Sequence, residues 1–411
     1  PQLMPTPALS FAVRHLKCDA GICITASHNP AKYNGYKAYG SDGCQVALEM
    51  ADAILDEINR LDIFRDVKHM DYDAAVEQGS IKAIGEDVVI AFLNAVKSQS
   101  ILDCSDSDLK VVYTPLNGSG KMCVTRIFNM IGIKNITIVP EQSEPDGNFP
   151  TCPYPNPEFR EALQVGLNLC ESVQPDLLVA TDPDCDRMGI AVRHNGDYQL
   201  LNGNEVGVLL LDFIARNRIA NGTMPKHPVA VKTIVSTDLT DSVAKEYGIE
   251  LRSVLTGFKY IGDQIAGLEA NGEESRYIFG FEESYGYLSG SYVRDKDAVN
   301  ASMLVCEMAV DYKKQGKTLV DAIHDIYEKH GYFLNELMNF TFEGQDGMNK
   351  MQSIMEHLRT NTPTKIADFA VVGWSDYKAS KCFDGTIETE ITLPKSNVLE
   401  YRLENGSKLI V

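Results

Sequence analysis

Residues 176–187, with the sequence DLLVATDPDCDR, join a short apolar run to three aspartates at alternating positions. A run of this kind, 177–180, is typical of a buried strand. Asp182, Asp184 and Asp186 cannot continue a half-buried strand, because three like charges would then line one face. We therefore expect a loop that wraps the three carboxylates around a hard cation, and oxygen ligands of this kind suit Mg²⁺.

A solvated turn and a calcium-binding EF-hand both fit the acidic loop less well than a magnesium site. The abrupt step from a buried strand to three aspartates argues against a solvated acidic turn. An EF-hand begins with the same Asp-x-Asp-x-Asp pattern, but it requires a glycine at loop position six and a glutamate at position twelve. Arg187 and Arg193 hold those two positions here. The sequence therefore excludes an EF-hand and favours a magnesium loop.

A second polar loop, TASHNP at residues 25–30, follows the apolar residues 22–24, which we expect to form a buried strand. Ser27 lies at the carboxyl end of that strand, beside His28 and ten residues before Lys37. A serine hydroxyl can bond covalently to phosphate, and nearby cations offset the phosphate charge. Ser-His pairs in loops are often only polar turns. A phosphatase with an aspartate nucleophile, however, would leave both Ser27 and the third aspartate unexplained.

A third step from strand to loop occurs at residues 277–286, YIFGFEESYG. Glu282 and Ser284 offer an acceptor and a donor–acceptor two residues apart, which suits adjacent hydroxyls of a sugar. The flanking glycines would let a ligand approach the backbone. Two charged segments are further candidates for this site: a glycine-bracketed loop TGFKYIG at 256–262, centred on Lys259, and RDKD at 294–297, whose cations could hold a phosphate.

These motifs together resemble the alpha-D-phosphohexomutases. The resemblance rests on TASHNP, YNGYK, TDPDCDR, TGFKYIG and GFEESYGY in that order, and it extends over essentially the whole chain. Order and spacing are most similar to the phosphoglucomutase branch, which includes phosphopentomutase-like relatives. Some phosphomannomutase relatives carry a histidine shortly after the Glu-x-Ser pair, where this chain has Gly286. The resemblance therefore favours glucose phosphate over mannose phosphate as the substrate.

The resemblance implies a role for each matching residue. Ser27 is the implied phosphoserine, which gives and takes the phosphoryl group. One Mg²⁺ per chain is implied at Asp182, Asp184 and Asp186, with an oxygen of phosphorylated Ser27 completing the site. The other implied roles are these: His28, Lys37 and Arg187 surround the phosphoryl group in transit; Glu282 and Ser284 grip the sugar hydroxyls; Lys259 lies on a specificity loop; Arg294 and Lys296 contact the non-reacting phosphate of the substrate.

The implied activity is that of a phosphoglucomutase, an isomerase that moves a phosphoryl group reversibly between O1 and O6 of glucose phosphate. Glucose 1,6-bisphosphate is the implied intermediate and activator, and it must turn around before it returns its other phosphoryl group to Ser27. Such chemistry depends mainly on alignment and charge neutralisation. The alternatives are a phosphopentomutase or phosphomannomutase of the same family, a serine-dependent sugar phosphatase, and a non-catalytic protein that binds sugar phosphates.

The first and last motifs of the family are absent from the sequence. Relatives open with a Gly-Thr-x-Gly-x-Arg-Gly loop and end with an Arg-Pro-Ser-Gly-Thr-Glu-Pro phosphate clamp, and neither occurs between Pro1 and Val411. We therefore expect an internal fragment that lacks both ends of a longer enzyme, with negligible mutase turnover until those ends are restored.

Composition agrees with an enzyme of several domains in the reducing cytoplasm. The chain has 411 residues, which is too many for one core, with 44% hydrophobic and 23% charged residues. Ten cysteines without a CxxC pair indicate neither a zinc site nor a disulfide framework. The net charge of −19 disfavours nucleic-acid binding, and no apolar run has membrane length. We expect a cytoplasmic monomer or weak homodimer whose partner is a small sugar phosphate.

The fold class predicted from the sequence is α/β, with three similar layered domains, the first incomplete. Apolar strands at 110–115 and 228–233 each begin a unit that ends at a polar loop, and helices are predicted at 85–96 and 298–312. This alternation places ligand loops at the carboxyl ends of strands, around a central cleft.

The last segment of the sequence has a different pattern and predicts an incomplete α+β domain. It has a helical pattern near 349–359 and strand-like runs at 369–372 and 386–393. The predicted domains are the remainder of domain I with the phosphoserine loop (1–84), domain II with the metal loop (85–201), domain III with the sugar-binding loop (202–325), and a partial domain IV lacking the phosphate-binding loop (326–411).

Overall fold

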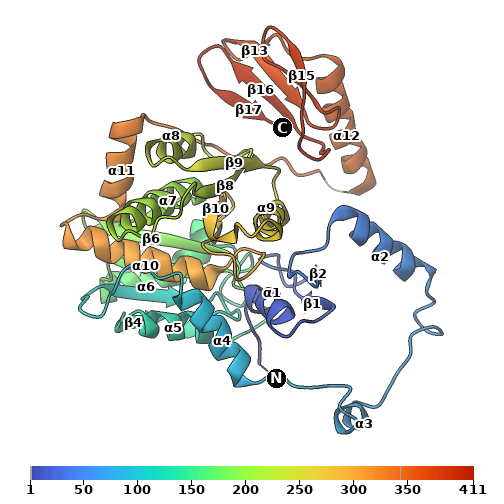
Figure 1. The fold of residues 1–411 in the computed structure, drawn as a ribbon, viewed down its shortest axis with the longest axis vertical. Coiled ribbons are helices and arrows are strands. Elements are labelled where there is room, and N and C mark those ends of the chain that lie inside the picture. Colours follow the sequence, from blue (N-terminus) through green and yellow to red (C-terminus); the bar gives the residue numbers. More distant parts are fainter. Residues whose placement is uncertain (1, 343) are drawn as a thin grey trace. The chain divides into compact units, whose positions relative to one another are not determined.

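The computed structural model describes residues 2–342 and 344–411, and the chain divides into two compact units (Figure 1). Both units combine helices with sheets, which confirms the predicted α/β class. Within the described residues, no helix combines the length and the apolar composition needed to cross a bilayer. The larger unit comprises residues 1–253 with 257–333, and the smaller unit comprises 254–256 with 334–411.

The serine loop is carried by a two-stranded ribbon in the larger unit. β1 (Ala20–Ile24) pairs antiparallel with β2 (Tyr36–Gly40), and α1 (Thr6–His15) packs on the ribbon. Side chains alternate between the two faces of a strand. On the face away from α1, Ile22 is 63% and Ile24 69% exposed. The prediction of a buried strand is therefore wrong here, because only one face of the ribbon is covered by described residues.

A five-stranded sheet carries the aspartate loop. Its order is β4-β3-β5-β6-β7, in which β3 is parallel to β4 and β5, and the last strands are antiparallel. β5 (Leu177–Thr181) is buried along its whole length, and the loop joins it to β6 (Met188–His194). The predicted buried strand is thus confirmed. The other elements of this segment are α2 (Leu48–Arg60), α3 (Tyr72–Glu77), α4 (Glu86–Lys97), β3 (Lys110–Thr114), α5 (Lys121–Met130), β4 (Asn135–Ile138), η1 (Pro140–Gln142), α6 (Arg160–Val173) and β7 (Asp197–Leu201).

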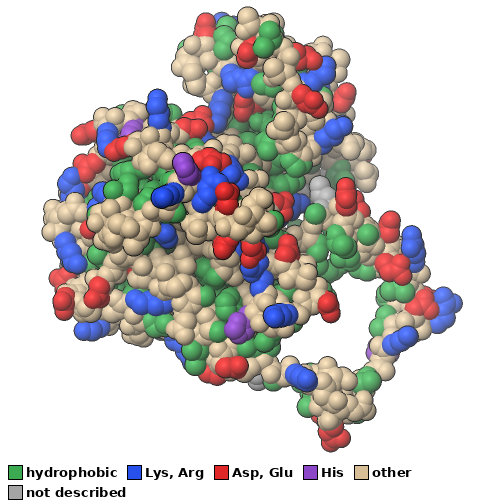
Figure 2. All heavy atoms as spheres, viewed as in Figure 1, with side chains coloured by type: hydrophobic (Ala, Val, Ile, Leu, Met, Phe, Trp, Pro, Cys, Tyr) green, Lys and Arg blue, Asp and Glu red, His purple; other side chains and the backbone are tan. Residues whose placement is uncertain are grey.

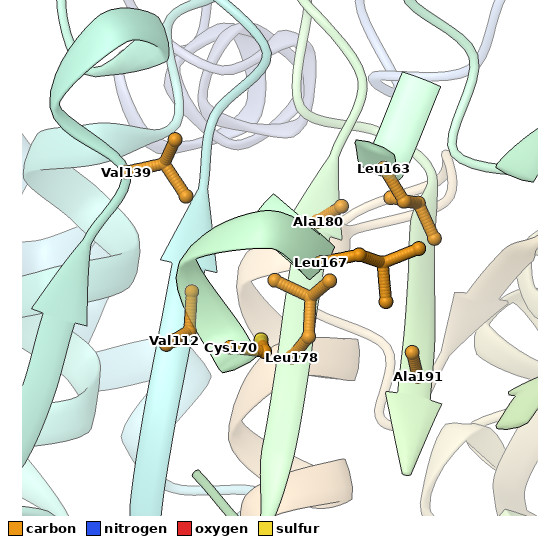
Figure 3. Packing of buried hydrophobic residues seen from close by; sticks show 8 residues of the cluster. All are labelled: Val112, Val139, Leu163, Leu167, Cys170, Leu178, Ala180 and Ala191. Atoms are coloured by element: carbon orange, nitrogen blue, oxygen red, sulfur yellow. The ribbon is translucent and has the colours of Figure 1, made fainter. Parts of the chain in front are cut away.

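Packing of α6 on this sheet forms the core beneath the aspartate loop. Leu163, Leu167 and Cys170 recur at the helical spacing and point at the sheet, where they meet Leu178 (Figure 3). Between them lies Gly166, where an added Cβ would be 3.0 Å from Leu178 Cδ1, so glycine permits the close approach. Full burial of one such leucine contributes about 1.5–3 kcal/mol. The loop at the end of β5 therefore starts from a well-packed base.

A second sheet of the larger unit, ordered β11-β10-β8-β9, carries the candidate sugar loop. β10 (Tyr277–Glu282) is parallel to β8 (Val229–Thr233) and antiparallel to β11 (Gly286–Leu288). The strand predicted at 228–233 is confirmed as β8. The predicted helix 298–312 is α10 (Ala298–Lys314), which is buried over most of its length. The remaining elements are α7 (Gly203–Ala220), α8 (Leu239–Glu246), β9 (Glu250–Val254), α9 (Phe258–Ala270), η2 (Glu274–Arg276) and α11 (Leu319–His330).

The smaller unit is an α+β arrangement, as predicted. It contains α12 (Gly344–Thr360) and an antiparallel sheet ordered β15-β14-β13-β16-β17, with β12 paired to β13. The strand predicted at 386–393 is shorter than expected, because Asp384 Oδ1 accepts the backbone N–H groups of Thr386 and Ile387 in a turn. Its strands are β12 (Lys365–Ile366), β13 (Phe369–Asp376), β14 (Lys381–Phe383), β15 (Glu388–Glu390), β16 (Leu399–Leu403) and β17 (Lys408–Ile410).

Candidate active site

Four segments of the larger unit meet around the three aspartates. The serine loop after β1 reaches the cluster through Ser27, whose Oγ donates to Asp182 Oδ2 at 3.2 Å. From β2, Lys37 Nζ lies 2.7 Å from Asp186 Oδ2, and from the segment before α10, Lys296 Nζ lies 2.9 Å from the same oxygen. The turn between β10 and β11 joins them through an antiparallel bridge between Gly286 and the residue after Asp186. Segments far apart in sequence thus share one site.

The aspartate loop presents carboxylate oxygens toward one point. Asp182, Asp184 and Asp186 are all buried, and one ligand oxygen from each lies within 4.8 Å of the others. Asp182 Oδ1 accepts the backbone N–H groups of Asp186 at 3.0 Å and of Arg187 at 2.9 Å, which holds the loop in a tight turn. Within the described residues, Asp184 Oδ1 and Asp186 Oδ1 are buried without a hydrogen-bond partner. Buried oxygens of this kind fit Mg²⁺, a hard cation that prefers carboxylates.

Burial and the neighbouring charges separate the pKa values of these aspartates. Burial, followed by the charges of Asp184 and Asp186, raises the pKa of Asp182 well above its usual value. For Asp186, burial acts in the same direction, but Lys296 and Lys37 outweigh it and lower the pKa. Burial opposes the charge of Lys37, yet Asp186 and Asp184 raise its pKa well above the usual value. Two permanent ammonium groups therefore compensate part of the acidic charge, and a divalent cation would compensate more.

Distant surface charges affect the electrostatics of the aspartate cluster less than these direct contacts do. Acidic and basic side chains are interspersed on the face shown in Figure 2. The Debye length at physiological salt is about 8 Å, so the net charge of −19 is largely screened at the site.

Ser27 lies at a strained turn and is half-buried. Its φ of 53° is left-handed, a conformation that non-glycine residues adopt only when surrounding contacts support it. Its backbone N–H donates to Thr25 Oγ1 at 2.8 Å, and its Oγ lies 3.1 Å from His28 Nδ1. Asn29 closes the turn, because its side-chain amide donates to Ala26 O at 2.9 Å. Burial, followed by the charge of Arg187, lowers the pKa of His28 to about 4, so its imidazole is neutral at pH 7.

A cavity of about 340 Å³ opens beside Ser27. Its lining includes the serine loop, Asp184, Ser119 from the loop between β3 and α5, and Phe149 from the loop between η1 and α6. Ser27 and Asp184 therefore line a common cavity.

Arg187, predicted beside the phosphoryl group, is held by a residue that the sequence did not reveal. Its Nη1 donates to Glu158 Oε1 at 2.8 Å, while its Nε is buried without a partner within the described residues. Burial raises the pKa of Glu158 despite the charge of Arg187. Glu158 follows an Asn-Pro pair in an irregular loop, and no spacing pattern marks it as part of a site.

The candidate sugar loop places one carboxylate in a confined position. Glu282 is 4% exposed, and its Oε1 accepts the backbone N–H of Gly257 at 2.8 Å. Burial raises the pKa of Glu282 to about 7. An added Cβ at Gly286 would lie 2.7 Å from Lys296 Cδ and 3.3 Å from Glu282 Oε2, so this position has no room for a side chain. Ser284 is half-buried in the turn beside them.

The structure corrects the predicted environment of Lys259. The segment 256–262 was expected to be a glycine-bracketed loop, but α9 begins at Phe258 and Lys259 lies in its first turn. Gly257, with a φ of 119°, marks the helix start, so the loop is confined to the residues before it. The Lys259 ammonium lies 5.1 Å from the centroid of the Tyr260 ring.

The structure separates Arg294 from Lys296, which were predicted to act on the same phosphate. Lys296 joins the aspartate cluster through Asp186. Arg294 is 1% exposed, and its guanidinium pairs with Glu269 and donates to the backbone carbonyls of Ser291 and Val293. Its charge is compensated inside the protein, so a phosphate contact by Arg294 would require these bonds to rearrange.

Asp295 is a second supporting residue that the sequence did not reveal. Its Oδ2 accepts from Tyr39 Oη at 2.8 Å and from Gln45 Nε2 at 2.9 Å, and its Oδ1 accepts the backbone N–H of Lys296 at 2.9 Å. Asp295 thereby ties β2, which carries Lys37, to the segment that carries Lys296. The charged run 294–297 marked the segment, but only the structure distinguishes the roles within it.

Comparison with known proteins matches the three segments of the larger unit to one family. Residues 1–63, 89–196 and 202–330 match, in that order, domains I, II and III of phosphoglucomutase/phosphomannomutase, each described as an alpha/beta/alpha domain. Phosphoglucomutase of Staphylococcus saprophyticus is 38% identical over 405 residues, which are 98% of this chain and 72% of the relative. Phosphoglucomutase of Staphylococcus aureus is 38% identical over 408 residues, covering 98% and 71%.

Solved structures share the fold at lower sequence identity. The crystal structure of a putative phosphomannomutase from Thermus thermophilus aligns with a TM-score of 0.66 at 22% identity over 99% of this chain and 77% of its own. The parafusin phosphoglucomutase of Paramecium, in an open form, aligns with a TM-score of 0.63 at 18% identity over 99% and 73%. At these identities the likeness concerns the fold alone.

Proposed function

The chain belongs to the phosphoglucomutase/phosphomannomutase family of alpha-D-phosphohexomutases, and on that premise we propose that it works as a phosphoglucomutase with Ser27 as the phosphoryl carrier. The reaction is reversible transfer between O1 and O6 of glucose phosphate through glucose 1,6-bisphosphate. One observation carries the proposal most directly: Ser27 Oγ lies 3.2 Å from Asp182 Oδ2, within a cluster that has two unpartnered carboxylate oxygens. The proposed nucleophile and the proposed metal site are therefore adjacent.

The residues that would hold Mg²⁺ are Asp182, Asp184 and Asp186, with an oxygen of phosphorylated Ser27 as a further ligand. The fit is supported by the buried Oδ1 atoms of Asp184 and Asp186. When bound, the ion would neutralise charge on the phosphoryl oxygens at the serine side. It would also offset the repulsion that raises the pKa of Asp182 after burial.

Lys37 and His28 have different proposed roles beside Ser27. The raised pKa of Lys37 keeps its ammonium charged at neutral pH, so we assign it an electrostatic role rather than that of proton acceptor. His28 is neutral, because burial first and Arg187 second lower its pKa to about 4. His28 Nδ1 lies 3.1 Å from Ser27 Oγ, so neutral His28 can accept the hydroxyl hydrogen bond in place of Asp182 and orient the oxygen for attack.

The substrate would be held by the turn after β10 and by cations at the other side of the site. Glu282 supplies acceptor oxygens for sugar hydroxyls, and Ser284 a hydroxyl beside them. Lys296 lies close to both the turn and the aspartates, which suits a phosphate passing between them. Lys259 and Arg294 are further proposed contacts to the substrate. Arg294 is paired with Glu269 in this structure, and this pair would have to open for the contact to form.

Glucose phosphate is the proposed substrate rather than mannose or pentose phosphate. The absence of space for a side chain at Gly286 supports this choice, since histidine at that place is a feature of some phosphomannomutase relatives. Rates on a panel of sugar 1-phosphates would rank the candidates. We further propose a cytoplasmic location, which the ten free cysteines support, and a monomer or weak homodimer.

Intact-mass measurement tests the proposed carrier. The chain is incubated with glucose 1,6-bisphosphate and Mg²⁺, and one added phosphoryl group is expected in the wild type and none in Ser27→Ala. A coupled assay for glucose 6-phosphate, run beside an assay for inorganic phosphate, separates a mutase from a serine-dependent sugar phosphatase. Phosphoryl uptake by Ser27→Ala at the wild-type level would refute the assignment.

A further inference from the structure

The two oxygens of Asp184 have opposite surroundings. Oδ2 accepts three hydrogen bonds, from Lys37 Nζ at 2.8 Å, Thr6 Oγ1 at 3.1 Å and Thr25 Oγ1 at 3.3 Å. Oδ1 is buried and has no partner anywhere in residues 2–342 or 344–411. Burial of a carboxylate oxygen without a donor is costly, so this asymmetry indicates that Oδ1 is reserved for a ligand.

The three donors determine which oxygen of Asp184 faces the cluster. The terminal torsion of an aspartate is broad, and the two oxygens of an isolated carboxylate are equivalent. Lys37 cannot define the terminal torsion of Asp184 by itself, because its ammonium is shared between Asp184 and Asp186, at 2.8 and 2.7 Å. The two threonine hydroxyls are neutral and come from separate elements, and they therefore fix the orientation without adding charge to the cation site.

Thr6 holds the aspartate loop at two points. Its backbone N–H donates to Asp184 O at 2.8 Å, and its hydroxyl donates to Asp184 Oδ2. Thr6 is the first residue of α1 and is 0% exposed, so its side chain has a single environment. Cys23 Sγ, from β1, lies 3.6 Å from the same hydroxyl. Thr6 thus connects α1, the ribbon and the aspartate loop.

Thr25 connects the same carboxylate to the nucleophile. Its hydroxyl donates to Asp184 Oδ2 and accepts the backbone N–H of Ser27 at 2.8 Å. Ser27 has the left-handed φ of 53°, which needs external support. One hydroxyl therefore supports the turn of Ser27 and the orientation of Asp184 together.

We propose that Thr6 and Thr25 are positioning residues for the metal, which hold Asp184 Oδ2 so that Oδ1 is presented to Mg²⁺. This inference rests on the proposed Mg²⁺ site and goes beyond it, because neither threonine is a predicted ligand. Partners that orient a metal ligand typically change metal affinity by about 10- to 100-fold when they are removed. Thr25 carries the additional task of aligning Ser27 with that site.

The test is Mg²⁺ affinity of the purified chain by isothermal titration calorimetry, without substrate. Thr6→Val and Thr25→Val preserve the shape of the side chain and remove the hydroxyl, and each should weaken Mg²⁺ binding by roughly 10- to 100-fold. Thr6→Ser and Thr25→Ser keep the hydroxyl and should bind Mg²⁺ close to the wild-type affinity. Thr240→Val is the matched control, because Thr240 is 0% exposed on α8 and its hydroxyl has no partner among the described residues.

Phosphoryl uptake by Ser27 distinguishes the two threonines. At saturating Mg²⁺, Thr25→Val should take up the phosphoryl group from glucose 1,6-bisphosphate more slowly than Thr6→Val, because only Thr25 also holds the Ser27 backbone. Melting temperature is recorded for each variant. If Thr6→Val unfolds, the half-buried Thr25 carries the affinity test by itself.

Each outcome separates this inference from the site on which it rests. Wild-type Mg²⁺ affinity in both valine variants would overturn the role of the threonines and leave the metal site intact. Weak binding in the serine variants as well as the valine variants would mean a purely structural role and would also overturn it. A wild-type chain that does not bind Mg²⁺ would overturn both the inference and the proposed metal site.

Discussion

β5 and β1 share a sequence pattern but differ in structure. Each is a short apolar run followed directly by a polar loop of the site. β5 is the central strand of a five-stranded sheet and is buried along its length. β1 belongs to a two-stranded ribbon, and Ile22 and Ile24 are largely exposed on its open face. An apolar run therefore indicates a strand before a loop, but it does not indicate how well that strand is packed.

The difference explains how the two loops are held. The aspartate loop starts from a close-packed core and closes on itself through backbone bonds to Asp182 Oδ1. The serine loop has less core beneath it, and side-chain bonds connect it to the aspartates: Ser27 to Asp182, and both Thr25 and Lys37 to Asp184. The less packed loop thus takes its position from the better packed one.

Removing one carboxylate from the aspartate loop should have the largest effect on this arrangement. Asp184→Asn keeps the size of the side chain and removes one of the charges of the Mg²⁺ site, and Mg²⁺ affinity should fall by at least about 100-fold. Folding stability should change little, because the like charges of Asp182 and Asp186 repel less. Titration calorimetry and thermal melting measure the two quantities. Asp197→Asn, at an exposed position at the start of β7, is the control, and unchanged Mg²⁺ affinity in Asp184→Asn would contradict the metal site.

Truncating one apolar residue in each strand tests the packing difference directly. Leu178→Ala in β5 removes a side chain that is 0% exposed, and the free energy of unfolding should drop by about 2–5 kcal/mol. Ile22→Ala in β1 removes one that is 63% exposed and should cost less than about 1 kcal/mol. Urea unfolding followed by circular dichroism gives both values. Equal losses would mean that the open face of the ribbon is covered in solution.

Residues 100–102, which lie in sequence between β1 and β5, are bonded to a buried carboxyl group, Glu307, whose titration should be measurable. Glu307 Oε2 accepts the backbone N–H groups of Ile101 at 2.8 Å and Leu102 at 3.2 Å, and Oε1 accepts the hydroxyl of Ser100. Burial raises its pKa from 4.5 to about 7. A raised pKa means that the folded state holds the proton more tightly than the unfolded state. Its stabilising contribution is therefore present below pH 4.5 and is lost as the pH rises to 7.

Glu307→Gln removes this titration and keeps one acceptor oxygen for the backbone N–H groups of Ile101 and Leu102, while its amide N–H can donate to the Ser100 hydroxyl. Between pH 5 and pH 8, the wild type should lose about 2 kcal/mol of unfolding free energy relative to the variant. Urea unfolding of both proteins at the two pH values gives the difference. A constant difference between the two proteins across this range would show that Glu307 does not titrate as proposed.

Titration of Glu282, at the end of β10, should have the smallest effect of these changes, and the effect should be on substrate binding. Burial raises the pKa of Glu282 to about 7, so the carboxylate becomes protonated as the pH falls below 7 and loses acceptor capacity. The dissociation constant of glucose 1-phosphate, measured by titration calorimetry, should therefore rise by up to about tenfold between pH 8 and pH 6. Glu282→Gln should have a high dissociation constant at both pH values. Its ratio to the wild type cancels the titration of the substrate phosphate, and a ratio that does not change with pH would rule out Glu282 as the titrating group.

Local patterns in the sequence were sufficient to predict much of the molecule. The strands at 177–180 and 228–233, the helix at 298–312 and the aspartate loop were predicted from apolar runs, helical spacing and charge repulsion within a strand. The two errors have different origins. The burial of β1 depended on neighbours distant in sequence, whereas α9 starts at Phe258 because the adjacent Gly257 permits a sharp entry.

The roles of the supporting residues depend on contacts between segments, which the sequence does not report. Thr6 and Glu158 occur in stretches without a distinctive spacing, and Asp295 lies in the charged run 294–297, where the sequence did not distinguish its role. Each acts on a partner from another segment. A hydrogen bond requires a donor and an acceptor within about 3 Å, and sequence patterns report distances only along the chain or within one element.

By itself, the sequence identified the candidate residues for the chemistry: a serine, three aspartates, a glutamate and the cations around them, most of them at the end of a strand or in a loop. Chemical type and local periodicity are properties of short stretches, so a single chain is enough to identify them. The tertiary structure decided which oxygen of Asp184 is left open, that Lys296 joins the aspartates while Arg294 pairs with Glu269, and that burial shifts the pKa of Glu282. Those properties arise from burial and from contacts between distant segments, and they exist only when the chain is folded.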